Sequence, residues 1–146
     1  MAEPSDNFRV SAAGEYLTAA ELTIRGWQVC MSPHQPSFDI AAVKGEKFHR
    51  VQVKTAARPI IDKGKNLGRY GFACKHGGTN SAYTKADCDF IVFVGLEHRA
   101  FFVLPVKEVT SIKYNWSPGS HNCVLAPYFA AWGQLEKYPR RNGCRF

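Results

Sequence analysis

Two apolar stretches separated by a short glycine-containing segment constrain the fold of this chain more than any other feature. Residues 38–43 and 48–54 are rich in aromatic and β-branched side chains, and Lys44-Gly45-Glu46-Lys47 lies between them. This pattern predicts a β-hairpin with a four-residue loop. If Val43 faces Phe48 across the loop, the pairing of all other residues in the two strands follows.

The predicted pairing sorts the side chains of the hairpin onto two faces. Asp39 then faces Gln52, and Lys54, two residues further along, points to the same side of the sheet. The opposite face holds four apolar side chains, those of Phe38, Ile40, Val51 and Val53. We therefore expect Asp39, Gln52 and Lys54 to converge through local pairing alone, although a β-bulge would shift the register.

An amphipathic segment upstream of the hairpin predicts a helix. Ser11 can cap its beginning, and the helix is expected to run to about Arg25, where Gly26 ends it. Apolar residues three or four positions apart form the expected core-facing stripe, which consists of Val10, Ala13, Leu17, Ala20 and Ile24. Glu15 lies on a different side of this helix. The small residues near it would let the helix lie close against a sheet.

The remaining patterns predict the fold class. Further strands are expected at residues 27–31, 69–75, 90–96 and 100–104, a short helix from Pro105, and a closing amphipathic helix at 127–138. This order predicts an α+β or mixed α/β domain, with a central mixed β-sheet of about five strands flanked by helices. No repeat or linker divides the chain, so we expect a single domain over residues 1–146 with a basic tail at 137–146.

The positive charge of the chain is concentrated in one segment. The sequence has 19 Lys and Arg against 12 Asp and Glu, a formal net charge of +7, yet residues 1–43 have a net charge of −3 and residues 44–85 one of +8. This concentration predicts contact with the phosphates of nucleic acid, whereas the alternative is a solvated basic face. The candidate DNA contacts are Lys44, Lys47, Arg58, Lys63, Lys65, Arg69, Lys75 and Lys85.

Several features indicate an intracellular protein without a membrane partner. The longest apolar runs are far shorter than the roughly 20 residues that a membrane-spanning helix needs. The N-terminal residues are polar and lack the pattern of a secretory signal. Five cysteines, an odd number without a Cys-x-x-Cys pair, predict reduced thiols rather than disulfides or a zinc site. We expect a cytoplasmic or nucleoid-associated location.

The residues that the hairpin brings together match the needs of phosphodiester cleavage. A carboxylate such as that of Asp39 is the type of ligand that Mg²⁺ prefers, and Glu15 is a second candidate acid. A cation such as that of Lys54 can stabilise the attacking water or the charge that develops on the phosphate.

The spacing of these residues resembles the PD-(D/E)XK nuclease superfamily. Helical Glu15, then Asp39, then Gln52-Val53-Lys54 on the next strand follows the pattern of its catalytic motif. The stretches Val51-Gln52-Val53-Lys54-Thr55-Ala56 and Tyr83-Thr84-Lys85-Ala86-Asp87-Cys88-Asp89-Phe90 resemble in particular its group I intron-associated homing endonucleases, which have a Gln-x-Lys motif. The resemblance covers roughly residues 8 to 110 and implies a restriction-endonuclease-like core.

The resemblance also implies roles for individual residues. Asp39 takes the position of the metal-binding acid, Lys54 that of the catalytic lysine, and Glu15 that of an auxiliary acid. The implied ligands of Mg²⁺, for which Mn²⁺ would substitute, are Asp39, Gln52, Val53 and Glu15. Gln52 stands where the family has Asp or Glu, which removes one negative charge and puts metal affinity in doubt. Phe38 replaces the proline of the motif, which leaves the carboxylate unaffected.

These observations predict a Mg²⁺-dependent endonuclease that hydrolyses phosphodiester bonds in double-stranded DNA, in the manner of a homing or restriction enzyme. Because one chain provides one site, cutting both strands favours a homodimer or homotetramer. The alternatives are a Holliday-junction-type resolvase and a catalytically inactive DNA-binding module of the same fold. RNA ranks below DNA as a substrate because the chain has no ribonucleoprotein-type aromatic motif.

Three residues in the stretch from Tyr83 to Phe90 have structural as well as functional interpretations. Asp87 and Asp89 are expected first as caps or ion-pair partners and second as metal ligands. Tyr83 is expected either in the core or in contact with phosphate.

Overall fold

The predicted hairpin lies at the centre of the fold in the computed structural model, which describes residues 5–32, 37–64, 68–76 and 79–138. Strand β2 (Ile40–Lys44) pairs with β3 (Lys47–Ala56), and Val43 faces Phe48 as predicted. The pairing continues to Lys44 and Lys47, so the turn has two residues instead of four. Gly45 adopts a φ of +58°, the conformation that a two-residue hairpin turn requires at its first position.

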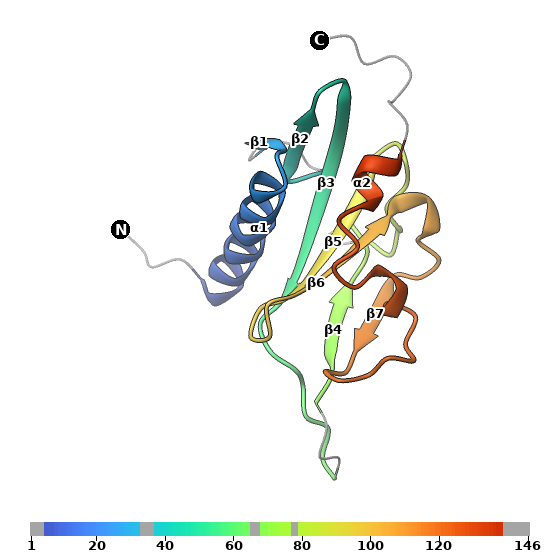
Figure 1. Ribbon diagram of the computed structural model, residues 1–146. Helices are drawn as coiled ribbons and strands as arrows, with labels where there is room; N and C mark the ends of the chain where they lie inside the picture. The colour runs from blue at the N-terminus through green and yellow to red at the C-terminus, as the bar shows by residue number, and fades with distance from the viewer. Residues whose placement is uncertain (1–4, 33–36, 65–67, 77–78, 139–146) are drawn as a thin grey trace.

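Three more strands extend the hairpin to a mixed sheet. β1 (Gln28–Met31) pairs antiparallel with β2, β5 (Phe90–Gly95) pairs parallel with β3, and β6 (Ala100–Pro105) pairs antiparallel with β5. The strand order is β1-β2-β3-β5-β6 (Figure 1). The prediction of a mixed sheet of about five strands in an α+β fold is confirmed.

Two further strands form a separate ribbon. β4 (Tyr70–Ala73) lies within the strand expected at residues 69–75, but it pairs with β7 (Lys113–Trp116) and not with the central sheet. β7 was not expected from the sequence. Tyr70 and Phe72 of β4 alternate with exposed or half-buried residues, as do Tyr114 and Trp116 of β7. Each strand therefore has one buried face.

The core consists of two layers, one on each face of the central sheet. On one face, helix residue Leu22 packs with strand residues such as Ile40 and Val51. On the other face, the buried rings of the β4–β7 ribbon pack against residues such as Phe93 and Phe102. The helix and the ribbon thus cover opposite sides of the sheet (Figure 1).

Helix α1 (Asp6–Ile24) begins six residues before the predicted start and buries a different face. Ser5 caps it by accepting a hydrogen bond from Phe8 N at 3.3 Å, so Ser11 lies inside the helix. The predicted stripe is wrong: the buried residues are Gly14, Thr18 and Leu22, and Ile24 is 78% exposed. The buried face of the helix thus combines two small side chains with the large apolar Leu22.

The C-terminal segment is not the predicted continuous helix of residues 127–138. It contains a 3₁₀ turn, η2 (Ala126–Tyr128), and a short helix, α2 (Gln134–Lys137). Between them Ala130 N donates to Phe101 O at 2.8 Å, which places this segment along the edge strand β6. Its aromatic residues divide between the two faces: Phe129 packs on Phe102, and Trp132 packs on Phe101. The expected helix after Pro105 is a single 3₁₀ turn, η1 (Val106–Glu108).

No helix in the described ranges is both long enough and apolar enough to cross a membrane.

Candidate active site

Asp39 lies directly before β2, where the regular pairing with β3 changes. Ile40 still faces Val51, yet Asp39 N donates to Val51 O at 2.9 Å, one residue out of step with that pairing. The Asp39 carboxylate accepts a hydrogen bond from Val53 N at 2.8 Å through Oδ2. The expected direct pairing of Asp39 with Gln52 is therefore replaced by this irregular arrangement. Phe38 consequently packs with the core layer on the ribbon side rather than with Ile40.

The position of Asp39 creates an open edge on β3. Strand β3 continues to Ala56, whereas β2 begins only at Ile40, so among the described strands the last residues of β3 pair with β5 alone. The N–H and C=O of a strand residue point to the same side of the strand. Because Val53 N points to Asp39, the Val53 carbonyl also points to this edge. Two oxygen donors, the carboxylate and the carbonyl, are thus present along one edge of β3.

Helix α1 brings a second carboxylate to this edge. At Gly14, a Cβ atom would lie only 1.8 Å from Thr55 Oγ1, so the helix backbone approaches the end of β3 as closely as a glycine allows. Glu15 follows Gly14 and is half-buried. Burial raises the pKa of Glu15, and the negative charge of Asp39 raises it further. The two acids from distant parts of the sequence therefore share one electrostatic environment.

Burial also raises the pKa of Asp39 above its ordinary value. The hydrogen bond from Val53 and the positive charge of Lys54 act in the opposite direction, but their effects are smaller than that of burial. Removing water from two neighbouring carboxylates is unfavourable unless positive charge compensates. A cation bound beside the two carboxylates would compensate this cost.

Lys54 lies between this edge and the ribbon side of the molecule. Its Nζ is 5.0 Å from the centre of the Tyr83 ring, and Tyr83 is only 5% exposed. The positive charge of Lys54 also opposes the increase that burial causes in the pKa of Cys74, which nevertheless reaches about 11. Of the two interpretations for Tyr83, the core interpretation is confirmed, and the ring also lies against the ammonium group of Lys54.

Gln52 is buried, with 7% of its surface exposed, and its amide Nε2 donates to Val53 O at 3.3 Å. The amide is therefore next to the carbonyl at the open edge. All four residues predicted for catalysis are thus found around the same part of β3: Asp39, Gln52, Lys54 and Glu15.

The donor set fits a magnesium ion. Asp39 and Glu15 supply carboxylates, Val53 a carbonyl, and Gln52 an amide, and all of these provide hard oxygen ligands. Within the described ranges, no three His, Cys, Asp or Glu side chains gather into a metal cage. Mg²⁺ does not need one, because it is typically held by one or two carboxylates together with water and substrate phosphate.

The predicted DNA contacts do not form one surface. Lys44 and Lys47 lie at the turn of the hairpin and pair with Glu136 at 2.6 and 3.8 Å. Lys47 is seven residues from Lys54, about 23 Å along a strand. The structure therefore does not bring Lys44 and Lys47 to the site.

The other predicted contacts occupy different positions. Arg69 and Lys75 flank β4, and both line one hollow on the ribbon. Arg58, Lys63 and Lys85 are exposed, while Lys65 lies outside the described residues. The basic block also contains Arg50, which is buried and bound to Asp89 and to the Ala86 and Lys85 carbonyls. Part of the charge excess in this segment is thus structural.

Asp87 and Asp89, the two acids in the stretch from Tyr83 to Phe90, have structural roles. Asp89 accepts a hydrogen bond from Arg50 N at 2.8 Å and forms an ion pair with the Arg50 side chain. Asp87 accepts from Thr84 N at 2.9 Å and lies 3.1 Å from His76. Their first interpretation, as capping and ion-pair residues, agrees with these contacts.

Two exposed polar residues on β7, Lys113 and Asn115, were absent from the candidates. They lie opposite Ala73 and Gly71 of β4. The signal that could have identified them is the alternation of polar and aromatic residues in Lys113-Tyr114-Asn115-Trp116, which is typical of a strand with one buried face.

The fold and the site together define the core of a nuclease. The sequence model of the PD-(D/E)XK endonuclease family matches residues 9–118, and the chain belongs to this family. The match covers both carboxylates, Gln52 and Lys54.

Two solved structures are similar to the chain. The bacterial homing endonuclease I-Ssp6803I aligns with a TM-score of 0.71 and 20% identity, over 91% of this chain and 95% of that chain. The Holliday junction resolvase Hjc of the archaeal hyperthermophile Archaeoglobus fulgidus aligns with a TM-score of 0.53 and 13% identity, over 90% and 98%. At these identities the likeness shows the fold. No protein of curated function matches the sequence.

Proposed function

We propose that the chain is a metal-dependent endonuclease that hydrolyses phosphodiester bonds in double-stranded DNA. The observation that carries this proposal is the pair of partly buried carboxylates, Glu15 and Asp39, at the open edge of β3 beside Lys54. Membership of the PD-(D/E)XK endonuclease family supports the reaction class. The net charge of +7 supports a polyanionic substrate.

The residues of the site divide the work of an in-line hydrolysis. Asp39, Glu15 and the Val53 carbonyl would hold Mg²⁺, with the Gln52 amide as a neutral fourth donor. When bound, Mg²⁺ supplies positive charge that offsets the charge developing on the phosphate oxygens. The Lys54 ammonium, supported by Tyr83, lies where it can hold the attacking water and stabilise the same charge. Water adds to phosphorus, and the bond to the 3′-oxygen breaks, which leaves a 3′-hydroxyl and a 5′-phosphate.

A cleavage assay on plasmid DNA tests the proposal. Supercoiled plasmid and a four-way DNA junction are incubated with the full chain over a series of Mg²⁺ and Mn²⁺ concentrations. We expect nicked and linear plasmid only when metal is present. Preference for the junction over linear duplex would instead identify a resolvase. Intact DNA at protein concentrations that shift it on a gel would contradict the enzyme and leave a DNA-binding module.

Matched variants assign the activity to the site. Asp39→Asn keeps an oxygen that can accept the Val53 hydrogen bond but removes the charge, and Lys54→Ala removes the ammonium. Each is expected to reduce cleavage by about 100-fold or more while DNA binding persists. Lys107→Ala, at an exposed lysine on η1, is the control and should cut normally. Cleavage that survives Asp39→Asn would place the reaction elsewhere.

The Gln52→Glu variant tests whether the negative charge that Gln52 lacks limits metal binding. A third carboxylate at the open edge should tighten Mg²⁺ binding, which calorimetric titration measures directly. If the wild-type chain binds DNA without cutting and Gln52→Glu restores cleavage, the neutral amide is the reason for the inactivity.

A further inference from the structure

The outer face of the β4–β7 ribbon has no role in the site described above. We define the ribbon face as the exposed or half-buried residues that flank or lie on the two strands: Arg69, Gly71, Ala73 and Lys75 from β4, and Lys113 and Asn115 from β7. The opposite side of the same strands is buried and aromatic. The ribbon is therefore fixed to the domain by one face only, and the other face is turned outward.

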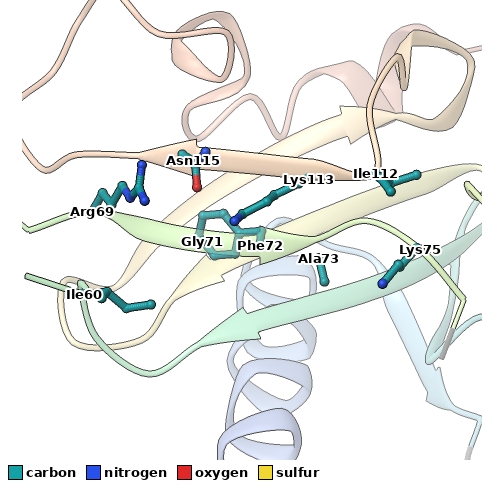
Figure 2. Close-up of a pocket in the computed structure, with 9 residues that line it drawn as sticks. All are labelled: Ile60, Arg69, Gly71, Phe72, Ala73, Lys75, Ile112, Lys113 and Asn115. Carbon is teal, nitrogen blue, oxygen red and sulfur yellow. The ribbon is translucent and has the colours of Figure 1, made fainter. Parts of the chain in front are cut away.

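The ribbon face is hollow and basic. It borders a hollow of about 340 Å³, which Figure 2 shows with its lining side chains. Gly71 and Ala73 have little or no side chain in the middle of the face. Figure 2 shows Arg69 and Lys75 toward its two ends and Lys113 extending across it. The other lining residues are Ile60, Phe72, Ile112 and Asn115, so none is acidic. Asp62, outside the lining, forms an exposed ion pair with Arg69 at 3.6 Å, and Lys75 and Lys113 supply the remaining positive charge.

The position of the ribbon relative to the active site is fixed by β4. Cys74 follows the last residue of β4, and the positive charge of Lys54 is close enough to oppose the rise that burial causes in the pKa of the Cys74 thiol. Lys75 is the next residue. From Lys75 the ribbon leads away from the site to Arg69, six residues earlier in the chain. Six residues of a strand span about 20 Å. At 3.4 Å per base pair this length corresponds to about six base pairs of duplex.

From this geometry we infer that the ribbon face enters the major groove of the DNA substrate and contacts base edges beside the cleavage position. This inference rests on the proposed function. The major groove is about 12 Å wide and admits a two-stranded β-ribbon, and the β4–β7 sheet has only two strands.

The side chains on the face match the groups that base pairs present in the major groove. An asparagine amide can form two hydrogen bonds with adenine, through its N6 and N7, and arginine or lysine can bond guanine O6 and N7. Asn115 lies over Gly71, where a Cβ would be 3.6 Å from Asn115 Oδ1, so the glycine leaves the amide open to the groove. Ile60 and Ile112 are 64% and 39% exposed at the rim and can contact thymine methyl groups.

The test measures base preference and not only affinity. The full chain is used to select binding sites from a randomised duplex library, and the selected duplexes are then cut to locate the preferred bases relative to the cleavage position. Asn115→Ala is expected to lose 5- to 150-fold in discrimination at one adenine-containing position within about six base pairs of the cut. Asn122→Ala, at an exposed asparagine in a loop, is the control and should keep the wild-type preference.

A base analogue distinguishes the major groove from other contacts. Replacing the preferred adenine with 7-deazaadenine removes N7 from the major groove and leaves base pairing intact. Wild-type binding should then weaken by a similar 5- to 150-fold, and Asn115→Ala should be insensitive to the analogue. Thermal melts of Asn115→Ala and Asn122→Ala check that both variants fold.

The outcomes separate this inference from the proposed function. If Asn115→Ala and Lys113→Ala weaken binding equally on all sequences, the ribbon contacts phosphates and the inference is overturned. If they have no effect while the chain still cuts DNA, the inference fails and the nuclease proposal stands. If the chain does not cut but the analogue and Asn115→Ala change its base preference as expected, the ribbon inference stands and the nuclease proposal fails.

Discussion

The two faces of the central sheet are covered in different ways. On one face, α1 approaches β3 so closely that Gly14 meets Thr55 without room for a Cβ. On the other face, the ribbon is held by large rings: Phe72 lies 5.1 Å from Phe93 between ring centres, and Trp116 lies 5.1 Å from Phe102. The helix side depends on a close backbone approach, whereas the ribbon side depends on buried aromatic volume.

This difference has consequences for function. The close approach of α1 sets the position of Glu15 next to Asp39, so any displacement of the helix changes the site. The rings of the ribbon pack in the core, on the side away from its outer face. We therefore expect substitutions in the helix contact to affect stability and cleavage together, and substitutions of the buried rings to affect mainly stability.

The largest expected effect comes from removing a ring on the ribbon side. Phe72 is 2% exposed, and Phe72→Ala should lower the free energy of unfolding by about 3–5 kcal/mol because it leaves a cavity. Urea denaturation measures this loss. Phe72→Leu, which keeps most of the volume, should lose much less. A loss below about 1 kcal/mol for Phe72→Ala would show that the rings do not hold the ribbon.

The next effect tests the helix side. Gly14→Ala should destabilise the protein by about 1–2 kcal/mol, because the new methyl group collides with the stiff Thr55 side chain. Cleavage should fall by more than the loss of folded protein explains, since Glu15 moves with the helix. Thr55→Ala removes the nearest atom, a buried hydroxyl without a partner among the described residues, and should restore part of both losses in the double variant. A gain in stability for Gly14→Ala alone would contradict the close approach, because alanine is the better helix former.

The third prediction concerns pH and the helix-side core. His49 is 3% exposed, its Nε2 lies 2.8 Å from Leu135 O, and its ring packs between Trp27 and Phe90. Burial is the largest influence and lowers the pKa of His49, so the unfolded chain takes up a proton before the folded one as the pH falls. Stability from the neutral form is fully present above the ordinary histidine pKa of about 6.5 and decreases below it.

Denaturation at a series of pH values tests this expectation. The wild-type free energy of unfolding should decrease as the pH falls below about 6.5, and His49→Gln should have a flatter profile in the same range. Equal slopes for the two proteins would assign the acid sensitivity to other groups.

The smallest effect is expected at the surface. Glu136 pairs with Lys44 and Lys47 across exposed positions, and Glu136→Gln should cost less than about 1 kcal/mol. The difference from wild type should vanish in high salt, because screening weakens exposed ion pairs. A salt-independent loss would indicate that the contact contributes through packing.

The sequence predicted the parts of the molecule that depend on local pairing. The hairpin register followed from a short loop, and it predicted that Asp39, Gln52 and Lys54 converge. The structure places Asp39 next to Val53 instead of directly opposite Gln52, because the pairing shifts by one residue at Asp39.

Features that depend on distant contacts could not be predicted in this way. The buried face of α1 contains Gly14 and Thr18 beside Leu22, a combination that the spacing of apolar residues does not select. Residues 126–138 follow the edge of β6, which interrupts the helix that their aromatic spacing indicates. The ion pairs of Lys44 and Lys47 with Glu136 join residues about ninety positions apart, so the sequence could not reveal them.

The two-residue turn at Gly45 also bears on how the site is assembled during folding. The residues from Asp39 to Lys54 form one continuous stretch, and hairpins of this kind form within about 1–10 μs. Pairing of β3 with β5 joins residues nearly forty positions apart, as Val51 with Phe90 does, and must close a much longer loop. We therefore expect Asp39 and Lys54 to meet early, and Glu15 to complete the site only when α1 docks on the finished sheet.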